Sequence, residues 1–355
     1  MIITATLLLA AAAAAPVAAG IPQGTTNYTL VDSFTPSNFF QEFNFFSGGD
    51  PTNGFVDYVD AATASQAGLA GYASDGVYLG VDYKNKVSMN TTAGGRQSTR
   101  VESKKSWTKG LFIADIRHMP SGAGDSKSCG LWPAFWFLGP NWPENGEIDI
   151  IEGINTQQSN FVVLHTAKTC KVANTGALAS TKLLLPECQG HIGCKQQPQG
   201  EHTFGAGFNA AGGGIYIMEW TDQAISTWFF PRGNPIANSL TTGANSTLSA
   251  PDPAKFGQPH AKFVGDGCSI QDSFKDQSII INTALCGDWA GKDWTKDATC
   301  KTLAPTCNEF VANTPEAFTN AYWVINSIRV FQQGQQQKPK VPYGRRGAQA
   351  VSFSA

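Results

Sequence analysis

The chain has 355 residues and a formal net charge of −2, and charged residues make up only 15% of it. This weak, balanced charge excludes the strong positive field of a typical nucleic-acid-binding protein and gives no reason to expect an anionic membrane surface as a partner. A neutral partner is favoured, and an aromatic content of 11% is ample for both a large core and a ligand-binding surface.

The first 19 residues have the pattern of a secretory signal. Ile2 to Ala15 form an apolar run, and Val17 to Ala19 provide small residues for cleavage before Gly20. No Lys or Arg precedes the run, so a membrane anchor is the alternative, but the run is shorter than the roughly 20 residues that a membrane span needs. We therefore expect a signal peptide at 1–19 and a secreted, extracellular protein.

Short segments rich in β-branched or aromatic residues recur along the chain, bounded by Gly, Pro, Asn or Asp, as is typical of strands. They are Val77–Tyr83, Gly110–Arg117, Phe161–Thr166, Gly214–Thr221, Ile225–Pro231, Ser278–Leu285 and Tyr322–Phe331. Helical periodicity is scarce, with one helical turn expected at Pro315–Ala321, whereas Cys170–Gly213 and Arg232–Gly257 have the composition of long loops. The pattern predicts an all-β fold of two packed antiparallel sheets.

The sequence N-G-E-I-D-I-I-E-G places three carboxylates, Glu147, Asp149 and Glu152, among three isoleucines. In a strand with a side-chain period of two, Glu147 and Asp149 share a face, but Glu152 should point to the opposite, buried side, where a carboxylate is costly. A β-bulge at Ile150 and Ile151 would return Glu152 to the face of the other two acids. We therefore expect a bulged strand with all three carboxylates on one face.

Such a row of acids suits glycoside hydrolysis. A retaining glycosidase needs two carboxyl groups about 5 to 5.5 Å apart, one as nucleophile and one as acid/base. The two glutamates can approach this range, with Asp149 beneath them to position one and to raise the pKa of a neighbour. The spacing also occurs on solvated strand faces and among calcium ligands. The preceding segment, Gly130–Pro143, contains three tryptophans and favours the catalytic interpretation.

The cysteine count agrees with export. An even number without C-x-x-C pairs favours disulfides over a zinc site, and most of the cysteines are expected to be oxidised and to staple long loops, with the pairing left open. The eight are Cys129, Cys170, Cys188, Cys194, Cys268, Cys286, Cys300 and Cys307. Sequons at Asn27, Asn90 and Asn245 are candidate N-glycosylation sites.

The segment between the predicted signal and the C-terminal tail contains neither a linker nor a repeat, so a single domain is expected at 20–332. The tail, 333–355, is polar and carries four basic side chains, which predicts a solvated, disordered end. It also lacks the terminal hydrophobic stretch of a GPI-anchor signal.

Several motifs together resemble the fungal laminarinases of glycoside hydrolase family 16, the endo-1,3(4)-β-glucanases. They are W-P-A-F-W, N-W-P, G-E-I-D-I-I-E-G, L-H-T and C-G-D-W-A-G, and the likeness runs from about Tyr28 to Gln332. The resemblance implies a concanavalin A-like β-sandwich jelly roll with a concave substrate groove. It also implies that Glu147 is the nucleophile, Asp149 assists and Glu152 is the acid/base. The shorter E-x-D-x-E of lichenases and cell-wall transglycosylases lacks the bulge.

The resemblance further implies four substrate-binding residues, Trp136, Trp142, His165 and Trp289. Indole faces stack on the C–H faces of pyranose rings, and His165 is expected to hydrogen-bond the sugar or the nucleophile. Core packing is the alternative for each tryptophan, and Trp132 is assigned to the core. Cys286, in the same motif as Trp289, could pin that loop.

Together with the row of acids and the predicted signal, the resemblance implies a secreted, endo-acting, retaining β-glucanase that cleaves β-1,3 and adjacent β-1,4 linkages in laminarin-type and lichenan-type polysaccharides. No cofactor and no metal are expected, and neither nucleic acid nor membrane is an expected partner of what should be a monomer. Two alternatives stay open. One is a β-glucan transglycosylase, in which a sugar hydroxyl replaces water, and the other is a non-catalytic β-glucan-binding module on the same fold.

Overall fold

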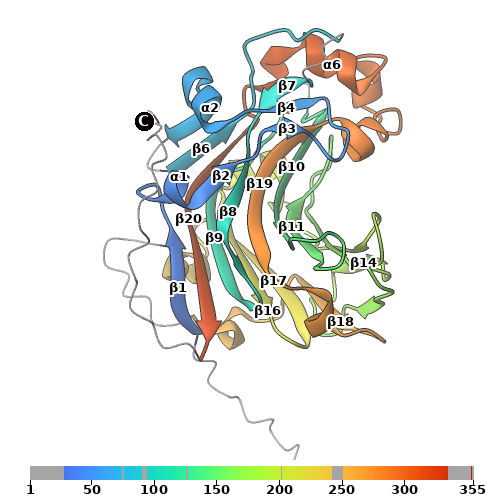
Figure 1. Cartoon of the computed structure of the whole chain (residues 1–355). Coiled ribbons are helices and arrows are strands. Elements are labelled where there is room, and N and C mark those ends of the chain that lie inside the picture. Colours follow the sequence, from blue (N-terminus) through green and yellow to red (C-terminus); the bar gives the residue numbers. More distant parts are fainter. Residues whose placement is uncertain are drawn as a thin grey trace, which may run out of the picture.

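The computed structural model describes residues 28–73, 76–89, 94–124, 127–200, 202–241, 251–334 and 353. The predicted signal peptide, the three sequon asparagines and most of the predicted tail lie outside these residues. Two large antiparallel sheets stack face to face and carry helices and loops around their ends (Figure 1). The expected all-β sandwich is therefore confirmed.

The first sheet has nine strands. Its order is β13 (Val172–Ala173), β18 (Ala261–Gly265), β17 (Ala224–Pro231), β16 (Gly214–Trp220), β9 (Gly110–His118), β20 (Tyr322–Gln333), β6 (Gly76–Gly80) and β5 (Ala70–Ala73), with β1 (Tyr28–Phe34) also paired to β20.

The second sheet has eight strands and carries the three acids. Its order is β14 (Lys182–Leu185), β15 (Cys194–Gln197), β12 (Phe161–His165), β11 (Glu147–Glu152), β10 (Leu131–Leu138), β19 (Gln277–Leu285), β8 (Arg100–Trp107) and β2 (Phe43–Phe45). A small third sheet contains β3 (Gly48–Gly49), β4 (Val56–Tyr58) and β7 (Arg96–Ser98).

The helices are short. They are α1 (Phe39–Glu42), α2 (Ala61–Ala67), α3 (Gly205–Ala210), α4 (Pro235–Leu240), α5 (Ile270–Ser273) and α6 (Cys307–Asn313), with 3₁₀ turns at Pro253–Phe256, Cys300–Thr302 and Pro315–Phe318 and a π turn at Gly287–Gly291. Within the described ranges, none of these helices has the length and apolarity of a membrane span.

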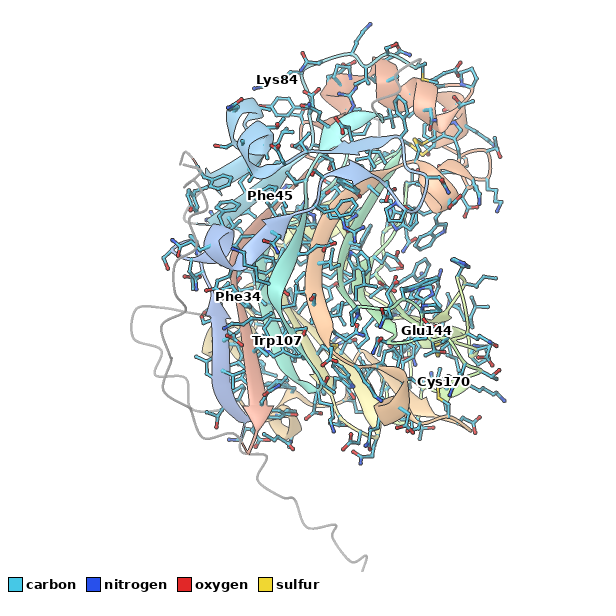
Figure 2. The ribbon with its side chains drawn as sticks, viewed as in Figure 1. Phe34, Phe45, Lys84, Trp107, Glu144 and Cys170 are labelled. Carbon is cyan, nitrogen blue, oxygen red and sulfur yellow. A yellow bond between two sulfur atoms is a disulfide. The ribbon has the colours of Figure 1, made fainter. Side chains whose placement is uncertain are left out.

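The main core fills the space between the two large sheets (Figure 2). Because side chains alternate along a regular strand, β10 and β19 of the second sheet send every other residue inward. Phe135 and Phe137 of β10 and Ile148 of β11 meet Phe112 of β9 and Tyr216 of β16, and all five are almost completely buried. The opposite side of the second sheet, which we call the open face, is left for polar and aromatic residues.

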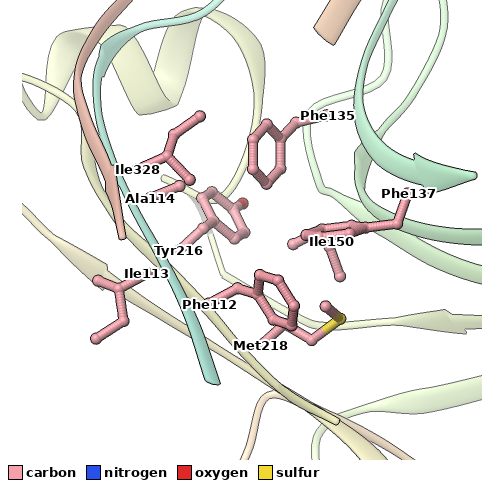
Figure 3. Close-up of a pocket in the computed structure, with 9 residues that line it drawn as sticks. All are labelled: Phe112, Ile113, Ala114, Phe135, Phe137, Ile150, Tyr216, Met218 and Ile328. Atoms are coloured by element: carbon pink, nitrogen blue, oxygen red, sulfur yellow. The ribbon is translucent and has the colours of Figure 1, made fainter. Parts of the chain in front are cut away.

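A small apolar cavity lies in this core directly beneath β11. Figure 3 shows Phe135, Phe137 and Ile150 of the second sheet facing Phe112 and Tyr216 of the first across it. The cavity is on the core side of the sheet, opposite the carboxylates, so it belongs to the packing and not to the ligand-binding surface.

A second apolar cluster packs beneath the small sheet, α6 and the π turn. Two disulfides tie these loops together, Cys129–Cys300 and Cys286–Cys307, while Cys170–Cys268 and Cys188–Cys194 close loops near β13 and β15. All eight cysteines are thus paired, and Cys286 pins the loop of Trp289, as the sequence suggested.

The ends of the predicted strands agree with the structure to within three residues. Other strands, among them β1, β8, β10 and β18, were not predicted from the sequence. The interpretation of Cys170–Gly213 as one long loop was wrong. This segment contains β13, β14, β15 and α3. Its Gln-rich and Gly-rich composition does not indicate strands, but β12 and β18 provide partners with which β15 and β13 pair.

One residue of the segment 333–355, Phe353, packs against aromatic residues of α1 and β2, which is not expected of a fully solvated tail. The ring of Phe353 stacks on Phe40, with centroids 3.8 Å apart, and lies 5.9 Å from the ring of Phe45. Apart from 333, 334 and 353, the predicted tail lies outside the described residues.

Candidate active site

The three acids of β11 lie on the open face because the strand is bulged. On the β10 side, Phe135 pairs with Ile151 and Trp136 pairs with Asp149, which leaves Ile150 without a partner. On the β12 side, the register also shifts between Asp149 and Glu152. Ile150 and Ile151 are both buried at 1% exposure or less. The expected bulge is confirmed, and its cause is that both isoleucines enter the core.

Burial changes the protonation of all three carboxyl groups. It raises the pKa of Glu147 and of Glu152, and it raises the pKa of Asp149 well above its usual range, where the like charges of Glu147 and Glu152 add to the effect. The pKa values of these three neighbouring carboxyl groups are thus all displaced toward the protonated form, most strongly that of Asp149. An environment that favours the protonated form is what a general acid needs.

His165 is the last residue of β12, the strand next to β11, and it pairs in register with Glu147. Its Nε2 is 3.5 Å from Asp149 Oδ2 and 3.9 Å from Glu147 Oε1. Its Nδ1 is 2.8 Å from the carbonyl oxygen of Gly190, which fixes the ring orientation. Burial alone would lower the pKa of His165, but Asp149 and Glu147 raise it to about 10. The imidazolium therefore neutralises part of the charge beside Glu147 and favours its ionised form.

Glu147, Asp149 and His165 each offer one ligand atom, and these atoms lie within 4.8 Å of one another. His165 Nδ1 faces the Gly190 carbonyl oxygen and Nε2 faces the two carboxylates, an arrangement in which the imidazole is placed as a proton donor on both sides.

Glu152 is held by an indole that the sequence assigned to the core. The Nε1–H of Trp132 donates to Glu152 Oε1 at 2.9 Å, so Trp132 lies on the open face and its assignment to the core was wrong. Alternation could have found it, because Trp132 and Trp136 are four residues apart on one strand and share a face. The donated hydrogen bond favours ionised Glu152 and opposes part of the effect of burial.

Trp289 belongs to the same aromatic group. Its ring is perpendicular to that of Trp132 at a centroid distance of 5.7 Å and near-parallel to that of Phe161 at 6.0 Å. The ammonium of Lys195 lies 4.2 Å from the centroid of Trp289 and 4.8 Å from that of Phe161. Its charge lowers the pKa of Glu152. Sequence reasoning missed Lys195 because β15 was taken for loop, so no face could be assigned to it.

Trp136 lies on β10, directly opposite Asp149 of β11. Its Nε1–H donates to Asn282 Oδ1 at 2.7 Å, and the amide of Asn282 in turn donates to the hydroxyl of Tyr58 at 2.9 Å. The guanidinium of Arg100 lies 5.1 Å from the Trp136 ring. Arg100 and Asn282 were missed by the sequence analysis, because neither occurs in a recognisable motif and β8 was not predicted.

Trp142 approaches the acids from the loop between β10 and β11. Its buried indole N–H forms no hydrogen bond of normal geometry among the described residues, but it lies close enough to favour ionised Glu147. Its ring is 4.7 Å from that of His191, in the short loop closed by the Cys188–Cys194 disulfide. The structure thus brings all seven predicted site residues to the open face or its rim around the acids.

Comparison with known proteins agrees with this geometry. Residues 43–331 match the model of the XgeA-like catalytic domain of glycoside hydrolase family 16. An endo-1,3(4)-β-glucanase of Arthroderma benhamiae is 43% identical over 319 residues, which cover 88% of this chain. The chain spans 66% of that protein's length and about half of the length of several other curated relatives that it matches.

Two solved structures share both fold and sequence with the chain. One is an elongating family 16 β-1,3-glucosyltransferase, which is 40% identical, with a TM-score of 0.74 over 86% of this chain and 100% of its own. The other is laminarinase 16A from Phanerochaete chrysosporium with β-glucans in its donor and acceptor sites. It is 36% identical, with a TM-score of 0.75 over 86% of this chain and 99% of its own.

Proposed function

Because the chain belongs to glycoside hydrolase family 16, we propose that it is an endo-acting, retaining β-glucanase that hydrolyses β-1,3 linkages and adjacent β-1,4 linkages. The observation that carries the proposal is the bulge of β11, which puts two glutamates and an aspartate on one face with separate partners. Glu147 faces the imidazolium of His165, whereas Glu152 accepts a hydrogen bond from Trp132. Two acids in different environments can take different roles.

In the first step, an ionised Glu147 oxygen forms a bond to the anomeric carbon as the bond to the glycosidic oxygen breaks. The proton of Glu152 moves to that oxygen, so the shortened chain leaves as a neutral alcohol. In the second step, ionised Glu152 takes a proton from water, whose oxygen displaces Glu147. Two inversions give net retention. Asp149 and His165 hold the charge balance of Glu147 through both steps.

We propose that a neutral glucan lies along the open face as in a groove. In this proposal Trp136 and Trp142 contact sugars beside Asp149 and Glu147, and Trp132 with Trp289 contacts sugars beside Glu152. Indole faces bury the C–H faces of pyranoses without requiring one hydroxyl pattern. Lys195 adds a polar group near Glu152, where it can bind sugar hydroxyls, whereas Asn282 holds the indole of Trp136 in place through its hydrogen bonds.

A second candidate function is transfer of the glycosyl group to a sugar hydroxyl in place of water. The 40% identity to an elongating β-1,3-glucosyltransferase favours it. A non-catalytic glucan-binding module has less support, because the chain retains both glutamates and the aspartate of the motif.

The proposal is tested by incubating the purified protein with laminarin, lichenan and cellulose and sizing the products. We expect internal cleavage of laminarin and lichenan, and none of cellulose. Glu147→Gln, which keeps the side-chain shape, serves as the inactive control. If oligosaccharides longer than the substrate accumulate at high acceptor concentration, transfer is the better description, and if no reducing sugar is released from any glucan, the proposal fails.

His165→Gln is expected to move the activity optimum to higher pH. Glu147 must be ionised, and the charge of His165 lowers its pKa; without that charge the pKa rises, so activity is lost at a higher pH on the acid side. The pKa of Glu152 rises as well, although by less because His165 is a smaller influence there, which moves the alkaline limb the same way. Loss of a buried charge-assisted contact of roughly 1.5–3 kcal/mol should lower kcat by about ten- to a hundredfold.

The measurement is the pH profile of kcat/KM on laminarin for both proteins. A profile that keeps its position while kcat falls would mean that His165 orients the site without tuning Glu147.

We also propose that the protein works in an oxidising, extracellular compartment. Its four disulfides support this, since such bonds persist where thiols are not kept reduced.

A further inference from the structure

The bulge that brings Glu152 to the open face leaves a problem of backbone pairing. A bulge sets two residues against one, so the partner strand has one peptide unit too few opposite it. The unmatched peptides of β11 lie around Ile151, and the side chains of Ile150 and Ile151 are buried. Buried peptide groups without partners are costly.

The side chain of Asn160 forms hydrogen bonds with these unmatched backbone groups. Asn160 immediately precedes β12 and is 1% exposed. Its Nδ2 donates to the carbonyl oxygen of Ile150 at 2.6 Å, and its Oδ1 accepts from the backbone N–H of Glu152 at 2.9 Å. These two backbone groups flank Ile151. A primary amide offers the same donor and acceptor as a peptide unit, so Asn160 supplies the pairing from a side chain.

The Asn160 side chain with its two backbone hydrogen bonds, which we call the clamp, is itself anchored to the opposite sheet. The backbone N–H of Asn160 lies 3.2 Å from the Thr203 hydroxyl oxygen, to which it donates. The carbonyl of Thr203 accepts from the hydroxyl of Tyr216, on β16. Asn160, Thr203 and Tyr216 are all at most 4% exposed. The backbone of Asn160 is therefore held in place by packing and by hydrogen bonds that do not involve the three acids.

We propose that Asn160 is a positioning residue for the acid/base: its amide fixes the peptides around Ile151 and so sets the direction in which Glu152 leaves the strand. This inference rests on the proposed function of Glu152. The longer E-x-D-x-x-E spacing therefore requires a hydrogen-bond donor and an acceptor that regular strand pairing does not supply. Glu147 and Asp149 precede the bulge and pair regularly with β12, so they are independent of the clamp.

The experiment compares two substrates that differ in their need for an acid. Laminarin oligosaccharides leave as alcohols and need the proton of Glu152, whereas 2,4-dinitrophenyl β-laminaribioside has a leaving group that departs without one. Asn160→Ala should lower kcat on laminarin oligosaccharides about 100-fold with KM within about twofold, since misplacement of about 1 Å has this effect. The pre-steady-state release of dinitrophenolate should stay within about threefold of wild type.

Two further variants keep the test decisive. Asn160→Asp keeps the shape and the acceptor for the Glu152 N–H, but a buried carboxyl that faces the Ile150 carbonyl oxygen donates only while it is protonated. The same selective loss, measured against wild type, should therefore appear in this variant as pH rises, even if the alanine variant does not fold. Asn209→Ala is the matched control, because Asn209 also bonds a backbone N–H and C=O, both of Met119, beyond the end of β9 in the other sheet. Its effect should be equal on both substrates.

Equal losses on both substrates in the Asn160 variants, or no loss, would overturn the positioning role while the proposed function stands. A wild-type protein that acts on neither substrate would overturn the proposed function and this inference with it.

Discussion

Glu147→Ala is expected to lose activity on laminarin by a factor on the order of 10⁴ or more, in line with the removal of other enzymatic nucleophiles. The variant should recover turnover of an activated β-glucoside in azide. Without the carboxylate no covalent intermediate can form, and the space left on the open face admits azide, which displaces the leaving group directly. The product is an α-glycosyl azide, with inverted configuration, and proton NMR of the anomeric signal identifies it.

Glu152→Ala should give the opposite anomer. Its nucleophile is intact, so an activated substrate still forms the glycosyl-enzyme, and azide entering where the base stood gives a β-glycosyl azide after two inversions. On laminarin the loss should be about 10²- to 10⁴-fold, the usual contribution of general acid–base catalysis.

Asp149→Asn is the control for both glutamate variants. Asp149 is buried between them and contacts His165, so we expect lower turnover and no rescue by azide. A β-azide from the Glu147 variant together with an α-azide from the Glu152 variant would reverse the assignment of the two roles.

Deletion of Ile150 is the second change with a large expected effect. It converts the motif to E-x-D-x-E, in which simple alternation puts all three acids on one face. Ile150 is the residue without a partner on β10, so the ladder can close without it. The position of Glu152 and the carbonyl that Asn160 binds are lost, however. We expect kcat/KM on laminarin to fall at least about 100-fold.

The control is Ile150→Ala, which removes the side chain and keeps the bulge. It enlarges the cavity beneath β11 and should cost roughly 2–5 kcal/mol of stability, with kcat/KM changing much less than in the deletion. Urea unfolding of both variants shows whether they fold. Wild-type turnover in a folded deletion variant would show that the bulge does not place Glu152.

Much of the fold followed from the sequence because alternation and turn residues are local signals. The bulge is one example, since the cost of burying Glu152 predicts it without any structure. Strands such as β14 and β15 were missed because their pairing depends on neighbours distant in sequence and their residues are weak strand formers.

The residues of the site show the same distinction between local signals and contacts that are distant in sequence. The three acids occur in a local sequence motif, as do Trp136, Trp142 and Trp289, so these residues could be identified from the sequence. Asn160, Lys195 and Arg100 act through contacts between β11, β12, β15 and β8 that only the register of the strands reveals. Trp132 could have been found, since its place on the open face needs only the alternation of β10.

The central claim is that Glu147 and Glu152 together retain the anomeric configuration. The most direct test is proton NMR of the wild-type protein during the first minutes of laminarin hydrolysis, before the anomers equilibrate. The β-anomer of the new reducing end should appear first, and the α-anomer should follow by mutarotation. An α-anomer released first would contradict the retaining mechanism and the role of Glu147 as nucleophile.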